Sequence, residues 1–198
     1  MRDSRRASGQ SSESGPFSHT VRRTRLDSIP VPPKLRGKWA LGITPRNFTW
    51  ILKDRLAVCE RPGGYGDNHR RVRRQEEIIW IRENGFGHVV SIITAPHNLH
   101  NYVEMNVSHS HRPFSNDAVD EWAKSLFVEL KSHLAKKTKV IVHGEEVGDR
   151  IMGAMGAFIR WSGLVDDPTE AIMVAEKLAG HQLDSSARAL ILRAHELR

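Results

Sequence analysis

Short apolar runs recur along most of the chain, and several of them have the length of β-strands. Two β-rich runs, residues 48–52 and 55–59, are separated only by Lys53 and Asp54, which predicts a hairpin. The continuous apolar run at residues 88–93 is typical of a buried strand. Further short strands are predicted at residues 102–107 and 139–142.

Between these runs, apolar residues recur at the spacing of an α-helix. The segment 118–135 places apolar side chains, among them Trp122 and Leu126, on one face, and Asn116 or Asp117 precedes it as a helix cap. Four more helices are predicted at residues 73–83, 151–162, 168–178 and 185–197. Because strands alternate with helices, the sequence predicts an α/β fold whose helices flank a central, mostly parallel sheet of about four to five strands.

The first 36 residues lack this patterning. They are rich in Ser and Arg, contain few large apolar residues, and end in a proline-rich stretch with Pro30, Pro32 and Pro33. Such a composition cannot bury enough surface to offset the entropy of ordering, so residues 1–36 are predicted to be a disordered basic tail. The folded domain is then expected to span residues 37–198. A nucleic-acid-binding or phosphorylated arm is the alternative to a merely solvated tail.

The charge of the chain is unevenly distributed. The formal net charge is +7, but residues 1–38 contribute +6 of it and residues 39–198 only +1. A nucleic-acid partner could therefore bind through the tail, but it is not favoured for the folded part. No apolar run is long enough to span a bilayer, no secretory signal is present, and the single cysteine, Cys59, rules out a disulfide framework. We therefore expect a cytoplasmic protein without a membrane partner.

The segment with the clearest chemical signal is residues 140–151. An apolar strand leads into a loop that holds Glu145, Glu146 and Asp149, and Arg150 then opens an apolar helix. Such a loop can curl its backbone N–H groups around one centre, with the helix N-terminus behind it. This arrangement predicts an anion site.

From about residue 49 to residue 192, the chain resembles the cysteine-dependent protein tyrosine and dual-specificity phosphatases, in particular their compact bacterial members. The family signature is His-Cys, five residues and then Arg, and His143 and Arg150 match it in type and spacing. The resemblance implies a phosphatase-like α/β domain. Its phosphate-binding loop would consist of His143, Gly144, Glu145, Glu146, Val147, Gly148, Asp149 and Arg150.

The chain departs from this family at the residues that carry catalysis. Gly144 occupies the position of the nucleophilic cysteine, and Ile151 replaces the hydroxyl residue that follows the arginine. Alignment on Val107 and Pro113 places His109 where the family has its acidic Asp. These losses predict a pseudophosphatase, that is, a regulatory binding module that is not an enzyme. The alternative is an active phosphatase or phosphate-ester hydrolase with rewired, non-cysteine chemistry.

Two basic features could bind a protein partner, including a phosphoprotein, or another phosphate-bearing ligand. Arg150 could bind phosphate, but the nearby loop carboxylates favour an internal ion pair instead. The cluster of Arg70, Arg71, Arg73 and Arg74 either contacts such a partner or forms a solvated helix start, and four arginines at a helix N-terminus oppose the helix dipole.

No cofactor or metal is predicted. The histidines do not show the spacing of a known metal motif; the five that we considered are His97, His100, His109, His111 and His143. An acid/base pair between His109 and either Glu145 or Glu146 remains an alternative for a non-thiol hydrolase. Cys59 ends a predicted strand, and free cysteine is usually a buried small hydrophobe.

Overall fold

The structure, a computed structural model, describes residues 41–64 and 70–198. The predicted tail, residues 1–36, lies outside the described residues, so the expectation of disorder there stays a prediction.

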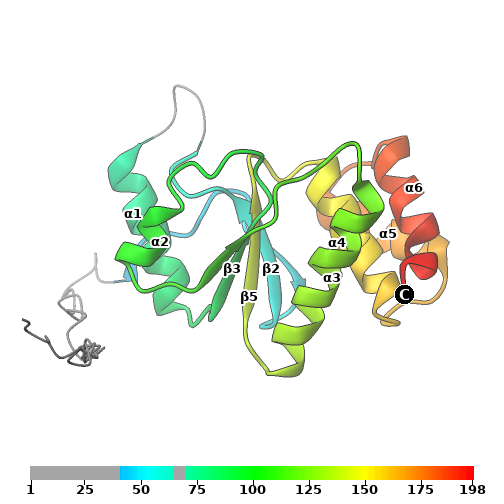
Figure 1. Ribbon diagram of the computed structural model, residues 1–198, viewed down its shortest axis with the longest axis horizontal. Helices are drawn as coiled ribbons and strands as arrows, with labels where there is room; N and C mark the ends of the chain where they lie inside the picture. Colours follow the sequence, from blue (N-terminus) through cyan, green and yellow to red (C-terminus); the bar gives the residue numbers. More distant parts are fainter. Residues whose placement is uncertain (1–40, 65–69) are drawn as a thin grey trace, which may run out of the picture. The chain divides into compact units, whose positions relative to one another are not determined.

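The described residues form a five-stranded sheet with the order β1-β2-β5-β3-β4 (Figure 1). Only β1 and β2 pair antiparallel, and the other neighbouring strands run parallel. The strands are β1 (Thr49–Leu52), β2 (Leu56–Glu60), β3 (His88–Ser91), β4 (His109–His111) and β5 (Val140–Gly144). The predicted α/β class and the mostly parallel sheet are therefore confirmed. The predicted hairpin is formed by β1 and β2, and its turn contains Asp54, whose φ is 59°.

Helices cover both faces of this sheet (Figure 1). α1 (Arg71–Glu83) and α2 (His100–Glu104) pack on one face. The other face carries α3 (Val119–Ala135), α4 (Asp149–Trp161), α5 (Pro168–Ala179) and α6 (Ser185–Arg193), followed by the 3-10 turn η4 (Ala194–Leu197). Within the described ranges, no helix is both long and apolar enough to cross a membrane.

Successive side chains of the central strands point to opposite faces of the sheet, and this divides the core into two layers. In β5, Val140 and Val142 pack with α3 and α4, whereas Ile141 packs with α1 and α2. Because successive side chains of a strand point to opposite faces, His143 lies on the same face as Ile141. The loop that follows β5 therefore begins at the junction of the two layers.

The prediction of a strand at residues 102–107 is wrong. Tyr102 belongs to α2, and the edge strand β4 begins only at His109. Leu99 and Tyr102 are both buried while Val103 is 65% exposed, so the apolar positions follow a helical spacing of three rather than an alternation of two. Asn106, with a φ of 55°, reverses the chain before Val107 returns to the core.

The start of α3 also differs from the prediction. Its N-cap is Ala118 rather than Asn116 or Asp117, and no side chain caps the helix. Trp122 instead fixes this end, because its indole N–H donates to the backbone carbonyl of Arg112 at 2.9 Å. The segment between Arg112 and Ala118 is thereby held at the edge of the sheet.

Two glycines set the distance from α4 to the helices behind it. A Cβ on Gly153 would lie 2.6 Å from the Cβ of Ala187 in α6. A Cβ on Gly156 would lie 2.7 Å from Ile191 of α6 and 2.8 Å from Ala175 of α5. These helices therefore approach α4 more closely than any side chain at the two positions would allow.

Candidate functional site

A pocket of about 630 Å³ lies where β5 ends and α4 begins. Its walls are the loop after β3, the segment that leads into α3, the β5–α4 loop and the first part of α6. The phosphate-binding loop predicted from the sequence thus borders the pocket through Gly144, Glu145, Glu146, Gly148, Asp149 and Arg150. In parallel α/β sheets, the carboxyl ends of the strands are the usual place for a ligand.

The backbone of this loop offers donors. None of the N–H groups from Glu145 to Ile151 donates a hydrogen bond to another group in the described part of the chain. Gly148, the N-cap of α4, provides no side-chain cap either. Free N–H groups at the start of a 13-residue helix favour an anion, because the helix dipole is positive there.

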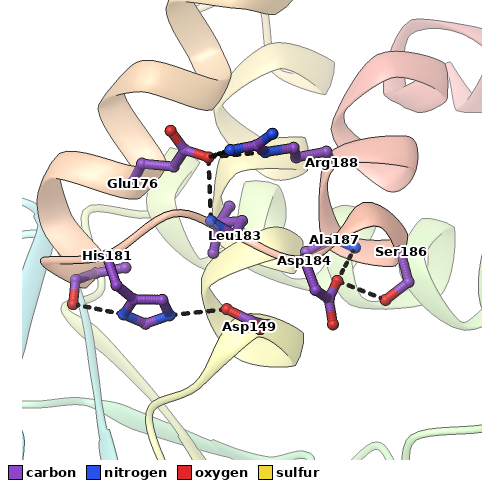
Figure 2. Close-up of polar contacts among 9 residues, drawn as sticks. Asp149, Glu176, His181, Leu183, Asp184, Ser186, Ala187 and Arg188 are labelled. Atoms are coloured by element: carbon purple, nitrogen blue, oxygen red, sulfur yellow. Dashed lines mark hydrogen bonds and ion pairs between the residues drawn. The ribbon is translucent and has the colours of Figure 1, made fainter.

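Two of the three loop carboxylates have a basic partner. Glu145 pairs with Arg61 at 2.7 Å. The Oδ1 atom of Asp149 lies 2.8 Å from Nε2 of His181, which follows α5 (Figure 2). The hydrogen bond to Asp149 raises the pKa of His181, and once the ring is protonated its positive charge offsets the negative charge of Asp149. The repulsion that these carboxylates would exert on a bound phosphate is thereby reduced, and only Glu146 remains without a salt-bridge partner within the described residues.

Arg150 does not form the expected ion pair with a loop carboxylate. Its guanidinium carbon lies 4.3 Å from the centre of the Phe114 ring, a cation–π contact that leaves the N–H groups available. Arg150 is exposed and lines the pocket beside Asn116. The structure therefore leaves this side chain free to bind a phosphate group in the pocket.

Gly144 lies at the buried end of β5, under the loop. A Cβ built on Gly144 would lie 3.0 Å from the carbonyl oxygen of Glu146 and 3.7 Å from Cγ1 of Ile92. The loop therefore lies closer to Gly144 than a larger residue would comfortably allow. A side chain at this position would require the loop to shift by a few tenths of an ångström, and Gly144 itself lines the pocket.

His109 does not reach the pocket. It begins β4 on the α2 side of the sheet, and its ring centre lies 5.4 Å from that of Tyr102. The acid/base pair that we considered between His109 and a loop glutamate is therefore not assembled. Farther along the same segment, Phe114 and Asn116 are the residues that line the pocket.

His143 belongs to a buried polar row beneath the loop. In the sheet, His143 lies directly beside Cys59 on β2 and Ser91 on β3. Both ring nitrogens of His143, the hydroxyl of Ser91 and the hydroxyl of Tyr102 have no hydrogen-bond partner within the described residues. Burial lowers the pKa of His143 to about 3, and the nearby charge of Arg61 adds to this effect. His143 is therefore neutral at physiological pH.

Cys59 cannot replace the missing nucleophile at Gly144. It is fully buried, and burial together with the charge of Glu77 raises the pKa of its thiol well above the usual value. A buried, protonated thiol is a poor nucleophile. Because Cys59 is the only cysteine in the sequence, cysteine chemistry is not available to this pocket.

The four arginines of the predicted basic cluster do not act as one group. Arg73 pairs with Glu77 at 2.8 Å, and the buried Arg74 donates to the side chain of Asn101 at 2.6 Å. Only Arg70 and Arg71 are exposed. α1 lies on the opposite face of the sheet from α4, so the structure does not bring these arginines together with Arg150 (Figure 1).

The wall formed by α6 was not found from the sequence. Asp184 lines the pocket and caps α6, where it accepts from the backbone N–H of Ala187 at 2.7 Å (Figure 2). Arg193 also lines the pocket and pairs with Asp120 of α3 at 2.6 Å. The Asp-Ser pair at residues 184–185 signals a helix start, but nothing in the local sequence indicates that this helix faces the phosphate-binding loop.

No protein-family model matches the sequence, and no curated protein matches it. Solved structures do match the fold. A kinase-associated phosphatase with its catalytic cysteine replaced by serine is 18% identical, with a TM-score of 0.62 over 78% of this chain and 95% of that chain. Tk-PTP in its active form is 16% identical, with a TM-score of 0.60 over 77% and 97%. A P. aeruginosa TpbA variant in complex with phosphotyrosine is 14% identical, with a TM-score of 0.59 over 83% and 92%.

These similarities show that the chain has the fold of protein tyrosine and dual-specificity phosphatases, as the resemblance implied. The prediction that the chain is not an enzyme is wrong, because its structural neighbours are mainly phosphatases, among them Tk-PTP in its active form, Siw14 and Cydia pomonella PTP-2. That prediction gave the missing thiol more weight than the rest of the site. Backbone N–H donors, a pocket and the exposed Arg150 all lie around Gly144.

Proposed function

We propose that this protein hydrolyses phosphate esters with water, rather than a cysteine thiolate, as the nucleophile. The observation that carries the proposal is the run of free backbone N–H groups from Glu145 to Ile151, which borders the pocket next to an exposed Arg150. The phosphatase fold of the structural neighbours supports it.

The phosphate group would bind at the N-terminus of α4. Its oxygens would accept hydrogen bonds from the loop N–H groups and from Arg150, whose guanidinium matches a phosphate at two points. The same contacts would stabilise the charge on the equatorial oxygens during transfer. The pairing of Glu145 with Arg61 and of Asp149 with His181 keeps two negative charges from opposing this binding.

Water would occupy the space beside Gly144, where the related enzymes have a cysteine side chain. Glu146 lines the pocket and would accept a proton from this water. The water oxygen would form a bond to phosphorus while the bond from phosphorus to the ester oxygen breaks. With an aryl phosphate, the leaving phenolate needs no proton, so the reaction can be tested without a general acid.

Replacement of Arg150 by alanine should abolish most of this activity. Loss of a charge-assisted contact to phosphate is expected to lower kcat/KM for p-nitrophenyl phosphate by roughly 100-fold. The matched control is Arg82→Ala, because Arg82 lies on α1 and pairs only with its neighbour Glu83. Steady-state release of p-nitrophenolate by the full chain is the measurement. No turnover by the wild type, or equal turnover by wild type and Arg150→Ala, would refute the proposal.

Two further substitutions separate the chemical step from binding. Glu146→Gln removes the proposed base and is expected to lower kcat by about 100-fold or more. Gly144→Ala adds a methyl group that would crowd the proposed water from the pocket wall, and kcat should fall on the order of 100-fold. In both variants, inorganic phosphate should still inhibit or bind as in the wild type. Glu121→Gln on the exposed side of α3 is the control for lost charge; unchanged kcat in Glu146→Gln would remove Glu146 from the mechanism.

A further inference from the structure

A group of two histidines and one glutamate lies between β3 and α3, away from the pocket beside Gly144. His88 is the first residue of β3, whereas Glu129 and His133 are four residues apart on α3. The ligand atoms of these three residues all lie within 4.8 Å of one another. His88 Nε2 and Glu129 Oε1 are 3.2 Å apart.

The neighbours of this group hold two of its ligand atoms in place. His88 Nδ1 bonds with the hydroxyl of Ser108 at 2.8 Å, and Nε2 lies 3.2 Å from both Glu129 Oε1 and the hydroxyl of Ser110. Arg112 donates to Oε2 of Glu129 at 2.5 Å and leaves Oε1 for another contact. Outer partners of this kind orient the histidine and carboxylate ligands of metal ions.

We propose that His88, Glu129 and His133 form a binding site for a divalent transition metal of the zinc type. Two ligand atoms on one tetrahedral zinc ion lie about 3.3 Å apart, as follows from bonds of about 2.0 Å. The separation of 3.2 Å between His88 Nε2 and Glu129 Oε1 matches this geometry. Two imidazoles and one carboxylate are a ligand set that zinc accepts, and the coordination positions that remain would take water.

Binding requires that the metal replace the proton that His88 Nε2 shares with Glu129, and that one ring move. The rings of His88 and His133 are stacked, with centres 4.0 Å apart and planes 17° apart, so their lone pairs do not converge on one point. His133 has room to turn, because it is only partly buried and lines a surface hollow together with Glu129 and Lys124. The two imidazole ligands favour zinc over Mg²⁺, which prefers oxygen ligands. The charges of Lys124 and Arg112 beside this hollow oppose any added cation, so the metal has to be held by short bonds to its ligands.

The metal would join α3 to the sheet rather than take part in phosphate hydrolysis. None of its three ligands lines the pocket beside Gly144. The inference therefore does not depend on the proposed hydrolase activity. Because zinc would bind only the folded chain, it should raise the midpoint of thermal unfolding.

The test is titration of the chelator-treated full chain with Zn²⁺ by calorimetry, and with Co²⁺ by visible absorption. The wild type should bind one equivalent of either metal at this site, with the strong visible bands of tetrahedral Co²⁺, and zinc should raise the unfolding midpoint. His133→Ala and Glu129→Gln should weaken this binding by at least about 100-fold and cancel the thermal shift.

The matched control is His195→Ala, because His195 is exposed near the C-terminus. This variant should bind metal as the wild type does. Failure of the wild type to bind either metal would overturn the proposal without any variant. Binding that persists unchanged in both His133→Ala and Glu129→Gln would also overturn it, since the metal would then lie elsewhere. If His133→Ala fails to fold, Glu129→Gln and the wild type still decide the outcome.

Discussion

Replacement of Gly153 by alanine is expected to lower the free energy of unfolding by about 2 kcal/mol. The new Cβ would lie 2.6 Å from the Cβ of Ala187 and 2.9 Å from its Cα, so α6 must move away from α4. Alanine favours a helix over glycine by about 1 kcal/mol, and the overlap has to exceed this gain. Denaturation by urea, followed by circular dichroism, measures the change.

A second substitution tests whether the overlap with Ala187 is the cause. Ala187→Gly alone should destabilise the protein by up to about 1 kcal/mol, because it places glycine inside α6. In the Gly153→Ala background, the same change removes the 2.6 Å contact and should recover about half of the lost stability. Additive losses in the double variant would show that the two residues do not compete for one space.

His143→Leu should make the protein more resistant to acid. The folded state holds His143 neutral down to about pH 3, whereas an unfolded chain protonates the ring near its ordinary pKa of 6.5. Protons therefore bind the unfolded state preferentially between these values, and stability falls as the pH drops from about 6.5 toward 3. The full loss attributable to His143 is of the order of 4 kcal/mol.

Leucine has a similar volume and binds no proton, so the variant should lack the loss of stability that protonation of His143 causes at acid pH. We expect the two proteins to differ by less than about 1.5 kcal/mol at pH 7 and the variant to be more stable by roughly 3 kcal/mol at pH 4. The difference between the two curves isolates His143 from other titrating groups such as Glu129. His195→Leu, at an exposed position, should follow the wild-type curve. Parallel curves for wild type and His143→Leu would mean that His143 is hydrogen-bonded or already protonated.

Much of the fold could be predicted because its strands and helices differ in their apolar spacing. The continuous run in β3 and the stop at Gly85, with its φ of 74°, identify two elements directly. The prediction for the segment around Tyr102 was wrong because a single helical turn has too few residues to distinguish the apolar spacing of a strand (two) from that of a helix (three). Tertiary packing of Leu99 and Tyr102 decides its conformation instead.

The candidate site was only partly predictable for a different reason. The loop from Gly144 to Arg150 is contiguous, so its spacing alone placed it at the end of a strand. The partners of its carboxylates, Arg61 and His181, come from distant parts of the chain and carry no local signal. For the same reason, the sequence could not show that two of the three carboxylates near Arg150 pair with Arg61 and His181, or that Arg150 lies over the Phe114 ring instead.

The wall that α6 gives to the pocket has a consequence for the order in which the site forms. α5 separates the phosphate-binding loop from α6 in the sequence, so a ribosome completes the loop while that wall is still unmade. A nascent chain that ends in α5 contains the loop but lacks the pocket wall formed by α6. The pocket is therefore completed only after α6 has docked onto the glycines of α4, late in synthesis.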